Sequence, residues 1–133
     1  MASVLVAALV VVGAGCEPEP SPNTRFGLGP AAIEPGLLAR AVVYNTCDSA
    51  AEARVELRDG RTGEVRKEAN FDALQSGLAA EVGVGASAPT QLVALIDFRC
   101  LEGPPQVPLA TLQVVDSATQ QTQITLELRR NNP

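Results

Sequence analysis

Three cysteines carry the most reactive side-chain groups of this 133-residue chain: Cys16, Cys47 and Cys100. A catalytic thiol needs a neighbouring base or a Cys-x-x-Cys partner to become a thiolate. The chain has no histidine, only Lys67 as a lysine, and no Cys-x-x-Cys motif. The same absences exclude a Ser-His-Asp triad and disfavour a Ser-Lys dyad. Cysteine catalysis is therefore not expected, and the odd number of cysteines needs another explanation.

Carboxylates are the remaining acid and base groups, and a hydrolase could use two of them in those roles. Most fall in expected loops or on polar strand faces, where a solvated surface charge is the favoured interpretation: Asp48, Glu52, Asp59, Glu64 and Asp116. Asp97 differs because it lies between Ile96 and Phe98 in an apolar segment. If partly buried it needs a partner, which Arg99 or Arg40 could supply. We therefore expect a structural salt bridge and no catalytic residue.

Motifs for cofactors and metals are missing or incomplete. Gly83 to Gly85 form a Gly-Val-Gly step without the rest of a nucleotide-binding fingerprint, which favours a bulge or loop start. No EF-hand spacing or zinc ligand set occurs, although a loop calcium site through Asp48 or Asp59 stays open. Phe71 is the best candidate for an exposed, sugar-binding ring, but packing is the simpler interpretation. We expect no cofactor, no metal site and no evident small-molecule substrate.

The charge pattern also argues against nucleic acid as a partner. The formal net charge is -5, whereas a nucleic-acid-binding domain presents a basic patch. One expected hairpin does gather basic residues: Arg54, Arg58, Arg61, Arg66 and Lys67. Acidic residues alternate with them: Glu52, Glu56, Asp59, Glu64 and Glu68. Such alternation indicates a solvated face of mixed charge.

The elements that position these groups begin after an apolar leader. Residues 2–12 read ASVLVAALVVV and are followed by Gly-Ala-Gly-Cys. This run is too short to span a bilayer, which takes about 20 residues. It is typical of the hydrophobic region of a secretory signal peptide, although the usual basic residues before it are missing. The alternative is a buried strand or helix, which the following Pro-rich tract argues against.

The residues around Cys16 resemble the processing site of a bacterial lipoprotein precursor. In that family the cysteine becomes the mature N-terminus and carries acyl chains such as palmitate. Ala14 and Gly15 suit the two positions before it, whereas Gly13 stands where a bulky aliphatic residue is usual. Cleavage at the same bond by ordinary signal peptidase, without lipidation, is the alternative. The resemblance implies a membrane anchor at Cys16.

A short Pro-rich segment, EPEPSP at residues 17–22, fits this organisation. Such a sequence favours an extended, semi-rigid tether. The expected boundaries are a signal peptide at 1–15, the lipidated Cys16 and tether at 16–23, and a folded domain at 24–133. In the Gram-negative members of the family an Asp after the cysteine retains the protein at the inner membrane. Glu17 stands there, so the resemblance implies the outer membrane, facing the periplasm or the cell surface.

Assigning Cys16 to lipid leaves Cys47 and Cys100 as a pair in an oxidising compartment. A disulfide between them would stabilise a small domain by about 4 kcal/mol through loop closure. Two separate buried thiols are the alternative. In a sandwich, Cys47 would follow an early strand and Cys100 would end a late one, which allows a bridge at one end or across the core.

From about residue 24 the dominant period is two, which predicts β-strands. The strand candidates are 37–45, 53–58, 91–100, 109–115 and 124–129, with 78–84 weaker because of its glycines. Segment 91–100 is apolar on both faces for half its length and predicts a central strand. Only 68–78 could carry a turn or two of helix. Asp59-Gly60 and Asp116 to Thr119 indicate hairpin turns.

This succession of strands predicts an all-β protein with a single antiparallel β-sandwich of about seven strands, immunoglobulin-like or transthyretin-like. The expected function is a non-catalytic binding or accessory module at the cell envelope, with a protein partner. A structural or adhesive subunit that assembles by strand addition is the alternative. A carboxylate-based hydrolase is the third hypothesis, which a cleft lined by paired carboxylates would revive.

Overall fold

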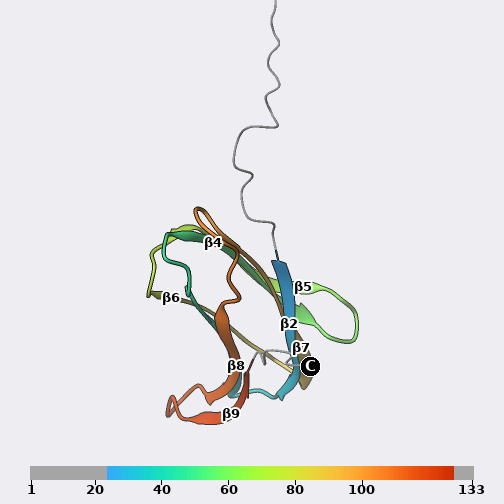
Figure 1. Cartoon of the computed structure of the whole chain (residues 1–133). Coiled ribbons are helices and arrows are strands. Elements are labelled where there is room, and N and C mark those ends of the chain that lie inside the picture. The colour runs from blue at the N-terminus through green and yellow to red at the C-terminus, as the bar shows by residue number, and fades with distance from the viewer. Residues whose placement is uncertain (1–23, 128–133) are drawn as a thin grey trace, which may run out of the picture.

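A computed structural model gives the fold of residues 24–127 (Figure 1). The expected signal peptide, Cys16 and the tether lie outside these described residues, as do residues 128–133. The strands are β2 (Thr24–Ile33), β3 (Leu37–Tyr44), β4 (Ala51–Asp59), β5 (Val65–Leu74), β6 (Ala79–Gly85), β7 (Thr90–Cys100), β8 (Leu109–Asp116) and β9 (Thr122–Glu127). Nowhere in this part of the chain does a helix have the length and hydrophobicity needed to cross a membrane.

The strands form two packed four-stranded sheets, with the orders β2-β7-β4-β5 and β6-β3-β8-β9. Every neighbouring pair is antiparallel. The prediction of an antiparallel β-sandwich is therefore confirmed. Only the pairs β4–β5 and β8–β9 are neighbours in both sequence and sheet; the other connections cross between the sheets.

The core follows from strict alternation along the strands. On β7, Leu92, Ala94 and Ile96 are buried, as are Phe98 and Cys100 further along. This strand lies between β2 and β4, so the prediction of a central strand at 91–100 is confirmed. Strands β3 and β8 supply the facing layer, largely with alanine, valine and leucine. Phe98 is the only aromatic residue among the large, fully buried side chains of the described chain.

The expected helical turn within 68–78 is wrong, because most of this segment belongs to strand β5. Ala69 and Phe71 pack against the core and lie opposite Val55 and Ala53 of β4. An edge strand needs apolar residues on one face only, and here a register shift near Ala53 interrupts their alternation. That interruption weakened the period-two pattern in the sequence.

Both expected hairpin turns are present, and an aspartate organises each. Asp59 Oδ1 accepts hydrogen bonds from the backbone N–H groups of Arg61 and Thr62 after β4. Asp116 Oδ1 accepts the corresponding bonds from Ala118 and Thr119 after β8. Asp59 therefore orders a turn, which gives it a role other than the calcium ligand considered from the sequence.

A disulfide joins Cys47 to Cys100, with a Cα–Cα distance of 5.8 Å. Cys47 follows β3 and Cys100 ends β7, so the bridge links the two sheets at one end of the sandwich. Buried Asn45 lies beside it; its side chain donates to the carbonyls of Ser49 and Leu74 and accepts from the Cys47 N–H. We call this the disulfide end, and the opposite one, with the two Asp turns, the far end.

Candidate functional site

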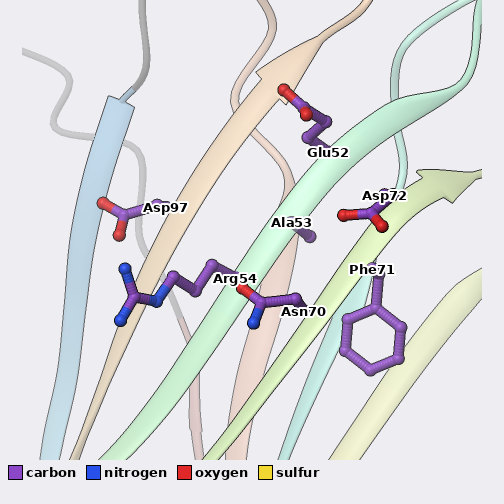
Figure 2. Close-up of a pocket in the computed structure, with 7 residues that line it drawn as sticks. All are labelled: Glu52, Ala53, Arg54, Asn70, Phe71, Asp72 and Asp97. Carbon is purple, nitrogen blue, oxygen red and sulfur yellow. The ribbon is translucent and has the colours of Figure 1, made fainter.

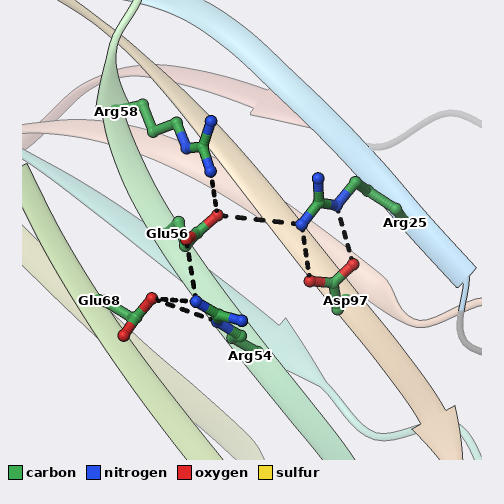
Figure 3. Close-up of polar contacts among 6 residues, drawn as sticks. All are labelled: Arg25, Arg54, Glu56, Arg58, Glu68 and Asp97. Carbon is green, nitrogen blue, oxygen red and sulfur yellow. Dashed lines mark hydrogen bonds and ion pairs between the residues drawn. The ribbon is translucent and has the colours of Figure 1, made fainter. Parts of the chain in front are cut away.

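The outward side chains of the β2-β7-β4-β5 sheet form a surface of alternating charge, which we call the charged face. Arg25, Asp97 and Arg54 lie side by side across three strands of this sheet. Arg25 donates from Nε to Asp97 Oδ1 at 2.9 Å and from Nη2 to Oδ2 at 3.1 Å. The bidentate pair fixes the geometry of both side chains (Figure 3).

Glu56 lies at the centre of the charged face and is only 4% exposed. Its two carboxylate oxygens accept hydrogen bonds from Arg54 at 3.2 Å and from Arg58 at 2.9 Å. Arg25 reaches across β7 from β2, and its Nη2 lies 4.0 Å from Glu56 Oε1. A carboxylate removed from water needs such compensation to remain charged. Three arginines, Arg25, Arg54 and Arg58, therefore surround the Glu56 carboxylate (Figure 3).

Further ion pairs extend this arrangement to the edge of the sheet. Arg54 also donates to Glu68 on β5, so one guanidinium joins two carboxylates. Hydrogen bonding to Arg54 lowers the pKa of Glu68, and the same bond raises the pKa of Arg54. Arg99 pairs with Glu52 nearer the disulfide end. Most charges of the charged face are thus paired with one another, and Asp72 on β5 is an exception among the described residues.

A shallow hollow of about 180 Å³ lies on this face (Figure 2). Its lining residues are Glu52, Ala53, Arg54, Asn70, Phe71, Asp72 and Asp97. The hollow includes carboxylates, as the hydrolase hypothesis requires. However, Glu52 is paired with Arg99 and Asp97 with Arg25. Glu52 and Asp97 would each have to be released from an arginine to donate a proton. The third carboxylate of the hollow, Asp72, is exposed and has no ion pair within residues 24–127.

Asp97 is half-buried and ion-paired as expected, but the expected partner is wrong. Arg25, directly opposite on β2, binds it in place of Arg99 or Arg40. Arg99 is committed to Glu52, and Arg40 belongs to the other sheet. The sequence did not show that residues 24–33 form a strand, so the partner on that strand could not be found.

The outward face of the β6-β3-β8-β9 sheet carries fewer charges than the charged face, and we call it the neutral face. Its outward residues on the two central strands are Leu38, Arg40, Val42, Tyr44, Leu109, Thr111 and Gln113. Arg40 is the one cation among them, and it donates to Gln113 Oε1 at 2.7 and 3.1 Å. Glu81 on β6 lies 3.8 Å from it. Gly83 lies directly opposite Arg40, and Glu127 on β9, opposite Thr111, is a further carboxylate of this face.

The four sheet edges differ in how readily they could accept another strand. Strand β5 carries Arg66, Lys67 and Glu68, and β2 is interrupted by a register shift around Pro30. Charges, prolines and irregularities of this kind block edge pairing. Strand β9 has no proline, glycine or charge before Glu127, and its Ile124 is 51% exposed.

A groove of about 350 Å³ lies between the edge strands β2 and β9. Its lining residues are Gly27, Leu28, Gly29, Thr125, Leu126 and Glu127. Strand β9, which has no proline, glycine or charge before Glu127, therefore borders this groove.

Exposed apolar side chains gather at the disulfide end. The described residues include seven large apolar side chains that are exposed, of which five lie there: Tyr44, Leu78, Leu101, Val107 and Leu109. We call these five the disulfide-end patch. Tyr44 lies directly opposite Leu109, which is 62% exposed, and Thr46 donates to the Val107 carbonyl at 2.9 Å. These contacts join the end of the neutral face to the loop that precedes β8.

Other residues singled out from the sequence have structural positions. Phe71 is half-buried against the core, as the simpler interpretation held. Asp48 is exposed in the loop after Cys47, and Gly83 and Gly85 lie in strand β6. Within residues 24–127, His, Cys, Asp and Glu side chains form no group of three that could hold a metal ion.

Glu56 is the central residue of the charged face that sequence reasoning did not single out. The signal was present, because Glu56 lies between Val55 and Leu57 with Arg54 and Arg58 two positions away on either side. In a strand, residues two apart share a face. An acid flanked in this way by two arginines indicates a paired group.

Comparisons with known proteins gave no relatives. No family model matches the chain, and neither a curated protein nor a solved structure is significantly similar to it.

Proposed function

We propose that this chain is an exported lipoprotein, acylated at Cys16, whose sandwich is a non-catalytic binding or accessory module at the cell envelope. The neutral face is the surface proposed to meet a protein partner. The observation that carries this proposal is the unequal distribution of charge between the two outer faces. Ion pairs of the charged face compensate one another, whereas the neutral face offers apolar and small polar groups that a partner can cover at low desolvation cost.

The cysteines support the export part of the proposal. Cys47 and Cys100 are bridged, and disulfides persist in oxidising compartments outside the cytosol. Cys16 is then the one cysteine left over, at the position where lipoprotein precursors are acylated. The non-catalytic part is supported by the absence of histidine from the sequence and by the arginine partners of Glu52 and Asp97.

Metabolic labelling tests the anchor. Radiolabelled palmitate should enter the full chain and not Cys16→Ser, when both are expressed with their leader in a Gram-negative host. Cys47→Ser is the matched control, because it removes a different cysteine and should still be labelled. Labelling of the wild type no greater than that of Cys16→Ser would contradict lipidation.

Chemical cross-linking in native envelopes tests the binding surface. Val42→Arg places a large charge at the centre of the neutral face, next to Thr111 on β8. It should remove a specific cross-linked protein, whereas Val65→Arg on strand β5 should retain it. Equal recovery with both variants would contradict the assignment of the neutral face. Circular dichroism on both variants checks that the sandwich is intact.

Strand addition at β9 is the second candidate, which the unprotected β9 edge favours. An extended segment of the partner would pair with the free edge of this strand, next to the groove. Ile124→Lys should block such pairing, because a charge on an edge strand opposes it. Ile124→Thr keeps a β-branched residue and is the matched control. Loss of the partner with Val42→Arg but not with Ile124→Lys would exclude this candidate.

A further inference from the structure

We infer that the disulfide-end patch rests on the lipid surface to which Cys16 is anchored, so that the sandwich stands end-on at the membrane with its far end outward. This inference rests on the lipid anchor of the proposed function. It adds an orientation for the domain and a second, non-covalent contact with the bilayer.

The position of Thr24 supplies the first argument. Thr24 begins β2 and lies opposite Phe98, two residues before the bridged Cys100. The chain therefore meets the sandwich at the disulfide end. Residues 17–23 separate Cys16 from Thr24, and even a fully extended chain of this length spans under about 30 Å. The disulfide end is thus the part of the domain held closest to an acyl chain on Cys16.

The far end cannot easily take this place. The eleven residues of β7 extend over about 33 Å along the sandwich. For the far end to touch the bilayer, the tether would have to run back, almost fully extended, along nearly the whole length of the domain. The far-end turns also carry charged residues, including Asp59, Arg61, Glu64 and Asp116.

The chemistry of the disulfide end supplies the second argument. Leu101, Val107 and Leu109 lie in or beside the loop between β7 and β8, and Tyr44 lies opposite Leu109. Leu78 lies on the other side of β3, where its carbonyl accepts a hydrogen bond from the N–H of Asn45. An amphipathic ring such as that of Tyr44 suits the headgroup region of a bilayer. The connecting segments 45–50, 75–78 and 101–108 contain no lysine or arginine. Their acids are Asp48 and Glu102, so the contact is apolar and does not depend on anionic lipids.

The absence of tryptophan from the sequence allows a direct test of orientation. Val107 and Val65 are matched positions, because they are 42% and 44% exposed but belong to the disulfide end and to the far end of the sandwich. Val107→Trp and Val65→Trp are each made in the full chain. Each is expressed with its leader, isolated from membranes and placed in phosphatidylcholine vesicles that contain brominated lipid.

Quenching by bromine reports the distance of each tryptophan from the acyl region. We expect Trp fluorescence of Val107→Trp to be quenched several-fold more strongly than that of Val65→Trp, with a blue-shifted emission that added salt does not reverse. Equal quenching of the two variants, or stronger quenching of Val65→Trp, would overturn the proposed orientation. Protection of Val107→Trp in native envelopes without quenching in vesicles would assign the patch to a protein and would also overturn it.

Failure of the anchor is read separately from failure of the orientation. A chain that is not acylated does not sediment with the vesicles, which contradicts the proposed function. In that case a maleimide phospholipid is coupled to the Cys16 thiol, since Cys47 and Cys100 are bridged. The same comparison of Val107→Trp with Val65→Trp then decides the orientation with a chemical anchor in place.

Discussion

The two outer faces of this sandwich differ in how many charged side chains they carry and in how these side chains are paired. On the charged face, Arg25, Arg54 and Arg58 converge on Glu56, so charge is concentrated and internally compensated. On the neutral face, Arg40 is met by a neutral amide and a more distant carboxylate. The comparison teaches that this sandwich concentrates its ion pairs on one face and leaves fewer charges on the other. The face with fewer charges is the proposed binding surface, because its side chains cost less to remove from water.

The largest expected change in stability follows removal of the disulfide that links the two sheets. The disulfide links residues 53 positions apart, and its removal in a Cys47→Ser, Cys100→Ser double variant should cost about 4 kcal/mol of unfolding free energy. Urea denaturation measures this loss, and Cys16→Ser is the matched control with no expected change. A double variant as stable as the control would show that packing alone holds the two faces together.

Glu56→Gln tests the organisation of the charged face. Removing the buried charge leaves three arginines without their shared acceptor, and we expect a loss of about 2 kcal/mol. Glu81→Gln, which removes the carboxylate nearest Arg40 on the neutral face, should change stability by less than about 0.5 kcal/mol. Similar losses for the two variants would break the comparison. Urea midpoints at neutral pH provide the measurement.

Salt should distinguish the peripheral pairs of the two faces. The Arg25–Asp97 pair is partly exposed, so a double-mutant cycle should give a small coupling that shrinks as salt is added. The Arg40–Gln113 contact joins a charge to a neutral amide, and its coupling should depend much less on salt. An equal response of both couplings to salt would contradict the proposed difference between an ion pair and a bond to a neutral amide.

The smallest expected effect is a loss of stability at acid pH, to which Glu68 and Asp116 contribute. Arg54 lowers the pKa of Glu68, and the backbone N–H groups of Thr119 and Ala118 lower that of Asp116. A carboxyl group with a lowered pKa in the folded state stabilises the protein above its unfolded pKa, and this contribution is lost as the pH falls through the folded value. The loss therefore falls below about pH 4.

The origin of each acid-dependent contribution can be separated. Glu68→Gln and Asp116→Asn should each flatten the acid limb of urea stability. Added salt should reduce the contribution of Glu68, which depends on an ion pair, more than that of Asp116, which depends on a turn. The reverse ranking would contradict the assigned causes.

Much of the fold could be predicted from the sequence, because alternation along segments such as 91–100 reports burial directly. Strands β2 and β5 were harder. Strand β2 contains Gly27, Gly29 and Pro30, which reduce strand propensity, and β5 lies at an edge with a broken alternation. Pairing across strands depends on sheet order, which single-sequence patterns do not contain. For this reason Asp97 was expected to be paired, but its partner Arg25 was not identified.

The neutral face as a binding surface is the central claim, and a site-specific photo-cross-linker tests it most directly. One residue is placed at Thr111, on the neutral face, and a matched one at Asn70, on the charged face. After irradiation of native envelopes, mass spectrometry identifies any protein attached at each position. The account predicts one reproducible adduct from position 111 and none from position 70. An adduct from position 70 alone, or the same adduct from both, would contradict it.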